Sequence, residues 1–223
     1  IAAAMPDGVP LDEIADRART VGKEQAFRIG VRVLSETVSA VEAGVAFSQL
    51  AGLLLNRLHA AVAEDAERRH GAAPGGRSAV IAMGKLGGRE MTAGSDLDLI
   101  IVYDAEEGAE VTSGSKPLSI NQFYARQAQK LIAALSSPTA EGVLYDVDMR
   151  LRPSGSKGPV AASLGSFRSY HKDSAWTWEK LALTRARPVC GDPSLVAELE
   201  AEIRASLCTP RDVAQTLTDV LDM

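Results

Sequence analysis

The segment GSDLDLIIVYD, residues 94–104, decides the fold, because it places two acids at the start of an apolar run. The aliphatic residues that follow are typical of a buried strand. A carboxylate inside a protein core is costly unless it is paired or holds a metal ion. Asp96 and Asp98 therefore need a partner, and the rest of the sequence can be searched for it.

The 223 residues have the composition of an ordinary globular protein, with 46% hydrophobic and 24% charged residues. The formal net charge of −5 argues against nucleic acid or an anionic membrane as a general partner, since both favour a basic surface. No apolar run approaches the roughly 20 residues that span a bilayer, and no secretory signal is recognisable. We expect a cytoplasmic protein that binds neither nucleic acid nor membrane, and the start at Ile1 favours a piece of a longer chain.

The cysteines and histidines predict no site of their own. Cys190 and Cys208 are far apart and lack neighbours at ligand spacing, so we expect reduced thiols. His59, His70 and His171 are equally isolated, and packing explains a lone histidine well.

Residues 11–70 carry apolar side chains at helical spacing, which predicts two or three helices. These helices are expected to end in a charged turn at 63–71, before a linker at 71–77 that is rich in Gly and Pro. Two runs rich in Val and Ile, at 78–84 and 96–104, are then predicted to be buried strands.

A further helix and a further strand follow these two strands. Ser119 and Gln122 have the spacing of a capping box, and Pro138 ends the predicted helix behind them. The segment GVLYDVDMRLRP, 142–153, alternates strictly between apolar and charged residues. It predicts a strand with one core face and one charged face.

The carboxy-terminal part is expected to be helical. Helices are predicted at 167–185 and 195–207, and a last one begins at Thr209. Residues two apart on a helix do not share a face, so at most one of Trp176 and Trp178 is expected in the core.

This order of elements predicts an α+β fold with a small mixed sheet, preceded and followed by helices. We interpret residues 1–76 as a helical segment, 77–193 as the domain that contains the sheet, and 194–223 as the start of a truncated helical region.

The acids on the two strands predict a metal site. Side chains at i and i+2 share a face of a strand, so Asp96 and Asp98 point at one spot. If the 142–153 strand lies beside them, Asp148 is a third acid, and Asp146 is a weaker candidate. Three such acids can hold two metal ions roughly 3.5 to 4 Å apart. Mg²⁺ is the expected ion, with Mn²⁺ as an alternative, because it takes oxygen ligands and leaves positions for phosphate.

A glycine-rich loop, 82–95, precedes the acids and suits a polyphosphate. The loop residues expected to contact a nucleotide are Gly84, Lys85, Gly94 and Ser95. Arg150 and Arg152, on the face of Asp148, are expected to neutralise the same phosphates. A metal, a phosphate loop and arginines together indicate nucleotidyl or phosphoryl transfer.

Each of these signals has a structural explanation when taken alone. A lone D-x-D pattern is more often a solvated strand end, and alternating Asp and Arg can form a surface ion-pair ladder. Their order along the chain, with apolar residues enclosing the acids, favours a functional site.

The same residues resemble a known signature. Gly84 and Lys85, followed after ten residues by DLDL at 96–99, are similar to the motif of DNA polymerase beta-type nucleotidyltransferases, although Lys85 replaces a small residue. The resemblance implies the fold of that superfamily.

Longer segments resemble the glutamine synthetase adenylyltransferases more specifically; they are 84–104, 122–132 and 145–193. That family of large bifunctional enzymes attaches AMP to a tyrosine of glutamine synthetase and removes it again. The segments RLRPSG, 150–155, and AWTWE, 175–179, resemble the carboxy-terminal, adenylylating half.

The resemblance implies roles for particular residues. Asp96, Asp98 and Asp148 would bind metal, and Gly94 and Ser95 would contact the phosphates of ATP. Asp148 is expected to be either a ligand of a second metal or the base that activates the tyrosine, whose ordinary pKa is about 10. Glutamine synthetase is the expected protein partner, and regulation by the signalling protein PII is expected only of the full-length enzyme.

Three other functions stay open at this point. The deadenylylating half shares the fold and the acids, but it uses inorganic phosphate as the nucleophile. A non-catalytic module that senses nucleotides would keep the fold without turnover. A nucleotidyltransferase acting on nucleic acid is disfavoured by the net charge, and for a small-molecule acceptor the sequence is silent.

Overall fold

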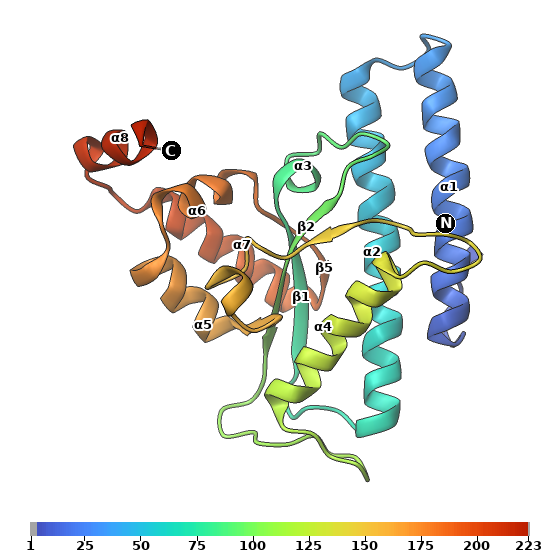
Figure 1. Cartoon of the computed structure of the whole chain (residues 1–223). Coiled ribbons are helices and arrows are strands. Elements are labelled where there is room, and N and C mark those ends of the chain that lie inside the picture. The colour runs from blue at the N-terminus through green and yellow to red at the C-terminus, as the bar shows by residue number, and fades with distance from the viewer. Residues whose placement is uncertain (1–3, 223) are drawn as a thin grey trace.

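The computed structural model describes residues 4–222 and has the predicted α+β class. A mixed sheet of five strands lies between two groups of helices (Figure 1). None of the helices in the described part of the chain is both long and apolar enough to cross a membrane. The elements are α1 Leu11–Leu34, α2 Ala40–His70, β1 Arg77–Ala82, α3 Gly84–Gly87, β2 Leu97–Asp104, α4 Ile120–Ser136, β3 Val147–Asp148, β4 Ala161–Ser163, α5 Leu164–Ser169, α6 Thr177–Ala182, β5 Arg187–Gly191, α7 Pro193–Cys208 and α8 Val213–Leu221.

Strand β2 organises the sheet. It pairs antiparallel with β1, which pairs antiparallel with β5 on its other side. Both β3 and β4 run parallel to β2, at 97–98 and at 101–103 respectively. The sheet is therefore mixed, and β3 meets β2 at the end where the acids lie.

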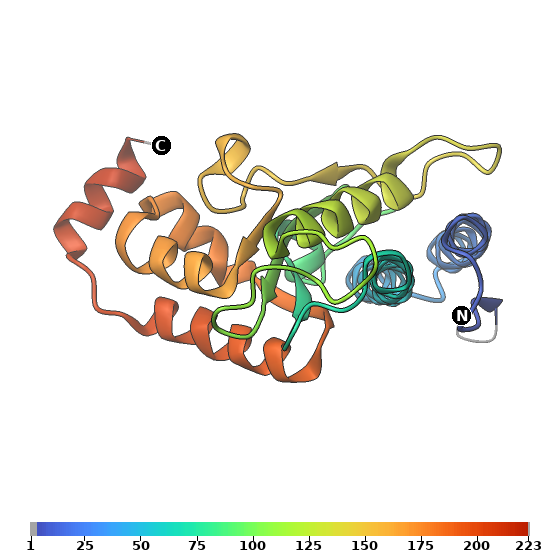
Figure 2. The ribbon, with the colours of Figure 1, turned by 90° about the horizontal axis from the view of Figure 1, so that it is seen from below.

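Both faces of the sheet are buried, which explains the continuous apolar runs of β1 and β2. Val80 and Ile101 point into a core shared with α1, α2 and α4. Ile81 and Val102 point into a second core formed with α5 and α7. Figure 2 shows these helices on opposite sides of the strands. A sheet covered on both faces has no polar face, so its central strands do not alternate.

Helix α2 extends further than expected. Ser39 and Glu42 form a capping box at its start, with the Ser39 amide 2.9 Å from the Glu42 carboxylate. The predicted charged turn at 63–71 is wrong, because the helix continues to His70. The charges fit there because Asp65, only 8% exposed, accepts hydrogen bonds from Arg69 one turn later and from Lys130 of α4.

The predicted strand at 142–153 is mostly wrong. Only Val147–Asp148 pairs with β2, and the chain then bends into a compact loop. The bend is held by Arg152, whose guanidinium donates to four backbone carbonyls, which belong to Met149, Ser156, Gly158 and Pro159. The alternation of apolar and charged residues here therefore belongs mostly to a loop, in which the charged groups bind nearby backbone and side chains.

The predicted helix at 167–185 is broken into shorter pieces. Helix α5 passes into a π-helical turn at 170–174, and α6 begins only at Thr177. Glu179 fixes this break, because its buried carboxylate accepts hydrogen bonds from the Tyr170 hydroxyl at 2.8 Å and from the Trp176 amide at 2.8 Å. Strands β4 and β5 were not predicted.

Both tryptophans lie at the surface, which agrees with the expectation that at most one of them lies in the core. Trp176 is 70% exposed and Trp178 43% exposed. The last helix begins at Val213 instead of Thr209, because the Asp212 side chain accepts a hydrogen bond from the Gln215 amide and caps the helix.

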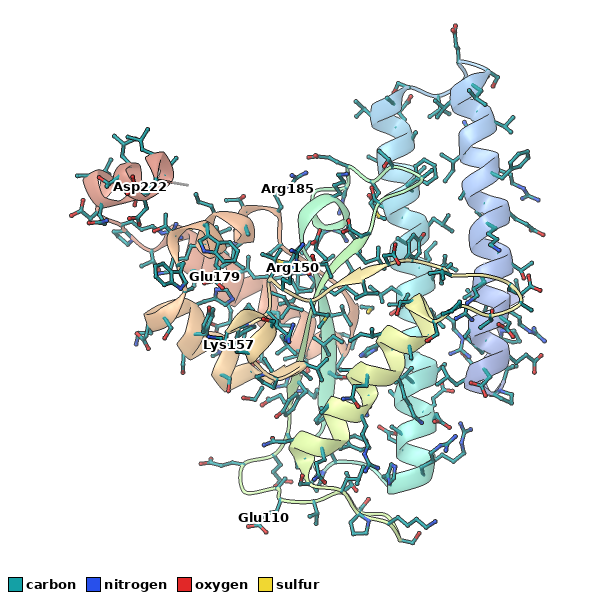
Figure 3. The ribbon with its side chains drawn as sticks, in the orientation of Figure 1. Glu110, Arg150, Lys157, Glu179, Arg185 and Asp222 are labelled. Atoms are coloured by element: carbon teal, nitrogen blue, oxygen red, sulfur yellow. The ribbon has the colours of Figure 1, made fainter. Side chains whose placement is uncertain are left out.

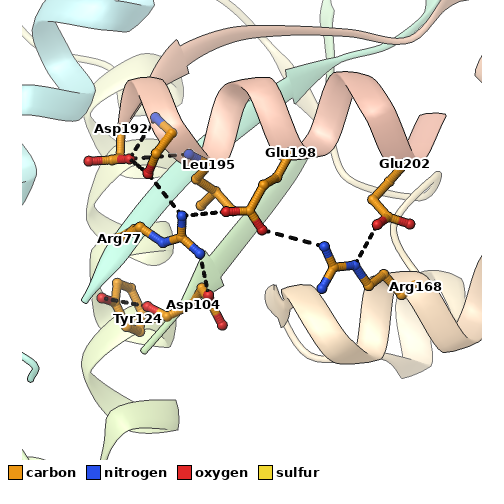
Figure 4. A network of polar contacts seen from close by, with 9 residues as sticks. Arg77, Asp104, Tyr124, Arg168, Asp192, Leu195, Glu198 and Glu202 are labelled. Carbon is orange, nitrogen blue, oxygen red and sulfur yellow. Dashed lines mark hydrogen bonds and ion pairs between the residues drawn. The ribbon is translucent and has the colours of Figure 1, made fainter. Parts of the chain in front are cut away.

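Arg77, the first residue of β1, connects the sheet to α7 (Figure 4). Its guanidinium lies 2.6 Å from Asp104 at the end of β2 and 2.6 Å from Glu198 of α7. The two carboxylates raise the pKa of Arg77. This network closes the end of the sheet that is opposite to the acids, and Arg168 extends it by pairing with Glu198 and Glu202.

Replacing Asp65 tests the contact between α2 and α4. Burial raises the pKa of Asp65, but hydrogen bonds from Lys130, Arg69 and Arg68 outweigh it and lower the pKa to about 2. The folded protein therefore gains stability above the ordinary pKa near 4, and loses it as the pH falls towards 2. Asp65→Asn should lower the free energy of unfolding by on the order of 2 kcal/mol at pH 7, measured by urea denaturation.

The difference between wild type and Asp65→Asn should shrink between pH 4 and pH 2, as the wild-type carboxylate becomes protonated. Glu13→Gln is the matched control, because the pair of Glu13 with Arg17 is largely exposed. The control should change stability by less than about 0.5 kcal/mol. Equal effects of the two variants at pH 7 would contradict the prediction.

Candidate functional site

Three acids converge where β2 begins. One carboxylate oxygen each from Asp96, Asp98 and Asp148 lies within 4.8 Å of the others. The parallel pairing of β2 with β3 produces this, because Leu97 lies opposite Val147 and Asp98 opposite Asp148. Asp96 is exposed and precedes the first strand residue, whereas Asp98 and Asp148 are half-buried.

Asp98 is the acid whose ionisation is most opposed. Burial raises its pKa first, and the neighbouring charges of Asp96 and Asp148 raise it further. Arg150 and Lys85 oppose this effect without cancelling it. A cation between the carboxylates would relieve the repulsion, so the cluster has the electrostatics of a cation site.

Arg150 neutralises Asp148. Its backbone amide lies 2.7 Å from one carboxylate oxygen, and its Nε and Nη2 lie 2.7 and 2.6 Å from the other. These hydrogen bonds lower the pKa of Asp148 and hold it ionised, even though burial acts in the opposite sense. The Arg150 side chain is otherwise largely exposed, and Figure 3 labels it among the side chains of the protein.

Gly84 is required by its contact with Asp98. Its φ is +51°, and a Cβ at this position would lie 2.1 Å from Oδ2 of Asp98. The adjacent Met83 amide donates to the Asp98 carbonyl at 2.9 Å. The four-residue helix α3 therefore begins directly against the acid cluster, with Lys85 exposed on it.

Gly94 and Ser95 form the turn that precedes Asp96. The Ser95 hydroxyl is buried, accepts a hydrogen bond from the Thr92 amide at 2.9 Å and lies 3.0 Å from the Thr92 hydroxyl. A Cβ on Gly94 would meet nothing within 4 Å, so packing within the protein does not require glycine there. The contacts of both residues with a nucleotide stay predictions.

The structure gives the other predicted residues different neighbours. Arg152 faces the carbonyls of its own loop, so its contact with phosphate also stays a prediction. Asp146 is exposed, and its carbonyl accepts from the Leu97 amide at 2.9 Å. Asp146 therefore contributes backbone to the β2–β3 pairing.

Arg187 was missed from the sequence, although it lies at the glycine turn. It begins β5, and its guanidinium donates to the carbonyls of Leu86 and Gly87. Strand β5 has only five residues of mixed composition, so it shows no periodic pattern in the sequence. The arginine at its start was therefore not singled out.

The histidines and cysteines lie outside this site. Burial lowers the pKa of His59 and of His171 to about 4, with Lys180 adding to the effect at His171. His70 donates a hydrogen bond from Nδ1 to the Lys116 carbonyl oxygen, 2.9 Å away. Cys190 and Cys208 are free thiols, as expected.

The acid cluster fits a divalent cation with a preference for oxygen. Its donors are carboxylates alone, which suits Mg²⁺ or Mn²⁺ better than a metal that prefers nitrogen or sulfur. Burial and then the charges of Asp96 and Asp148 raise the pKa of Asp98, and a bound cation would oppose both effects. Asp96, Asp98 and Asp148 are the residues that would hold the ion.

Asp98→Asn should separate charge from shape at this site. At pH 7 and low salt, the variant without added metal should melt no lower than wild type, because the substitution removes repulsion and little volume. This advantage should vanish below the pKa of Asp98, where the wild-type carboxyl is uncharged. Added Mg²⁺ should raise the melting temperature of wild type only, measured by calorimetry. An equal rise in the variant would rule out Asp98 as a ligand.

Gly84→Ala and Gly94→Ala form a matched pair. Alanine at 84 has an unfavourable φ and collides with Asp98, so it should cost about 1–3 kcal/mol of stability and weaken the Mg²⁺-dependent rise in melting temperature. Alanine at 94 meets open space and should leave the stability of the nucleotide-free protein within about 0.5 kcal/mol. The same melting curves decide the matter, and equal losses would contradict the assigned contact.

Comparison with known proteins places this geometry in a family. The family described as glutamate-ammonia ligase adenylyltransferase matches residues 1–202. Proteins named bifunctional glutamine synthetase adenylyltransferase/adenylyl-removing enzyme are similar throughout. The one from Brucella suis is 52% identical over 212 residues, which are 95% of this chain and 22% of that protein. The one from Rhizobium meliloti is 49% identical over 223 residues, 100% of this chain and 23% of that protein.

A third relative with the same name, from Xanthobacter autotrophicus, is 49% identical over 213 residues, 95% of this chain and 22% of its own length. The chain thus spans less than a quarter of the length of the curated relatives it matches. The match over nine-tenths of the chain, which includes the three acids and the glycine turn, shows that this protein belongs to the glutamate-ammonia ligase adenylyltransferase family.

Proposed function

We propose that this chain is a nucleotidyltransferase unit that moves AMP from ATP to a tyrosine of glutamine synthetase and releases pyrophosphate. The convergence of Asp96, Asp98 and Asp148 is the observation that carries the proposal. The names of the relatives support glutamine synthetase as the acceptor. In this role the protein would regulate nitrogen assimilation.

The reaction exchanges a phosphoanhydride bond of ATP for a phosphoester bond to the tyrosine. The phenolic oxygen of the acceptor forms a bond to the α-phosphorus, the bond from that phosphorus to the bridging oxygen breaks, and the phenolic proton is lost. A bound Mg²⁺ or Mn²⁺ would supply neutralisation of the phosphate charge. The low pKa of Asp148 makes it a weak proton acceptor, which favours the ligand role over the base role for this residue.

Arg150 provides positive charge beside the acids. Its guanidinium is largely exposed and pairs only with Asp148 among the carboxylates of residues 4–222, so it can also reach an anionic group on the substrate. Lys85 lies exposed on the glycine turn and lowers the pKa of Asp98. Both residues would offset the charge of a triphosphate and of the leaving pyrophosphate.

The direction of the reaction is part of the proposal. Segments 150–155 and 175–179 support the adenylylating half by their resemblance. Residues 77–193 would form the catalytic domain between the helical segments 1–76 and 194–223, in the cytoplasm. Any response to PII would belong to the full-length enzyme.

A transfer assay tests both the activity and its direction. The chain is mixed with Mg²⁺, unmodified glutamine synthetase and ATP labelled at the α-phosphate, and the label on the synthetase is followed. We expect label on a tyrosine, and we expect Asp98→Asn to lower the rate by at least about 100-fold, because the metal site loses an anionic ligand.

A second arm covers the reverse reaction. If no label is transferred, the same chain receives adenylylated glutamine synthetase and inorganic phosphate. Release of ADP would assign the deadenylylating reaction in place of the proposed one. No reaction in either arm, with ATP still bound, would favour a nucleotide-sensing module, and wild-type activity of Asp98→Asn would overturn the assigned acids.

A further inference from the structure

Arg187 contacts the end of the glycine turn that is farther from the acids. It lies beside Ala82 in the pairing of β5 with β1. Its Nη2 lies 3.1 Å from the Leu86 carbonyl oxygen, and its Nε lies 3.4 Å from that of Gly87. These are the last two carbonyls of α3, and a cation that donates to the last carbonyls stabilises a helix end.

The turn is packed directly against the segment that leads into β5. A Cβ on Gly87 would lie 1.8 Å from the Arg185 carbonyl oxygen and 2.6 Å from that of Ala82. Only glycine permits this approach. The position of α3 is thereby coupled to the backbone immediately before Arg187.

The other end of the same turn touches the acid cluster. Gly84 lies against Oδ2 of Asp98, and the turn between them is closed by backbone hydrogen bonds. The Gly87 amide donates to the Met83 carbonyl at 2.8 Å, and the Gly88 amide donates to the Gly84 carbonyl at 3.0 Å. A displacement at Gly87 would therefore reach Gly84 through one rigid helical turn.

The charge of Arg187 has no acidic partner. No carboxylate oxygen of residues 4–222 lies within 4.0 Å of its side-chain nitrogens. Burial and then repulsion from Arg89 lower its pKa. Keeping an arginine half-buried under these conditions is costly unless its fixed donors serve the carbonyls of the turn.

We propose that Arg187 is a positioning residue, which holds the glycine turn 84–87 against Asp98 and so sets the surface that receives the nucleotide. The inference rests on the proposed function for its nucleotide readout only. The contacts of Arg187 exist without any ligand, so its effect on the turn can be measured on the free protein.

The test uses Arg187→Gln in the 223-residue chain. Hydrogen exchange of the Gly87 and Gly88 amides, followed by NMR in the absence of ligand, should accelerate about tenfold, while the amides of β1 keep their wild-type rates. The dissociation constant of ATP with Mg²⁺, measured by calorimetry, should rise about tenfold, as expected for the loss of hydrogen bonds from a charged group. Arg187→Lys should give exchange rates and a dissociation constant between those of wild type and Arg187→Gln, because a lysine keeps the charge but lacks the planar guanidinium that donates to two carbonyls.

Arg168→Gln is the matched control, because it removes an arginine that pairs with Glu198 and Glu202 in the network at the end of the sheet opposite to the acids. It should leave the turn amides and the ATP affinity unchanged. Uniform acceleration at all amides in Arg187→Gln, or unchanged exchange at Gly87 and Gly88, would overturn the positioning role. Absence of ATP binding by wild type would overturn it too, whereas ATP binding without AMP transfer would count against the proposed function alone.

Discussion

Repulsion among three carboxylates is the interaction on which the rest of this structure depends. Asp96, Asp98 and Asp148 lie close together because the pairing of β2 with β3 places them there, and Arg150 offsets part of their charge. Two residues of parallel pairing fix Asp148 beside Asp98, and the buried sheet fixes the strand that carries Asp98. The stability of both cores therefore maintains an arrangement that the acids themselves oppose.

Two neighbours of the cluster make its negative charge tolerable in different ways. Arg150 supplies a direct counter-charge to Asp148, whereas Gly84 supplies space next to Asp98. The far end of the sheet has the opposite character, because Arg77 and its carboxylates are mutually satisfied there. One end of the sheet is thus electrostatically closed, and the other is left ready for a cation and an anionic substrate.

The parts of the fold that could be predicted are those with a strong local signal. Helices α1, α2 and α4 and strands β1 and β2 are long enough for periodicity or an apolar run to identify them. Strands β3 and β4 have two and three residues, and they exist because β2 offers them a hydrogen-bonding edge. The start of α8 was misplaced because Thr209 and Asp212 are both good capping residues, and only the folded chain selects between them.

The candidate site shows the same division between local and tertiary information. The acids could be found because carboxylates next to an apolar strand have few structural explanations. The contact of Gly84 with Asp98 depends on a backbone angle, and that of Arg187 depends on how β5 joins β1. The alternation at 146–152 was misleading, because Arg152 binds carbonyls that come close only after the loop has folded.

The exposure of both tryptophans has a consequence for spectroscopy. The chain contains two tryptophans, and both belong to the surface segment 176–178, while neither core contains an indole. Because both rings are already partly or largely exposed, unfolding of the two cores is expected to change their emission less than it would change that of a buried indole. Intrinsic fluorescence of this protein reports on events at α6, such as the approach of another macromolecule, and is a poor measure of global folding.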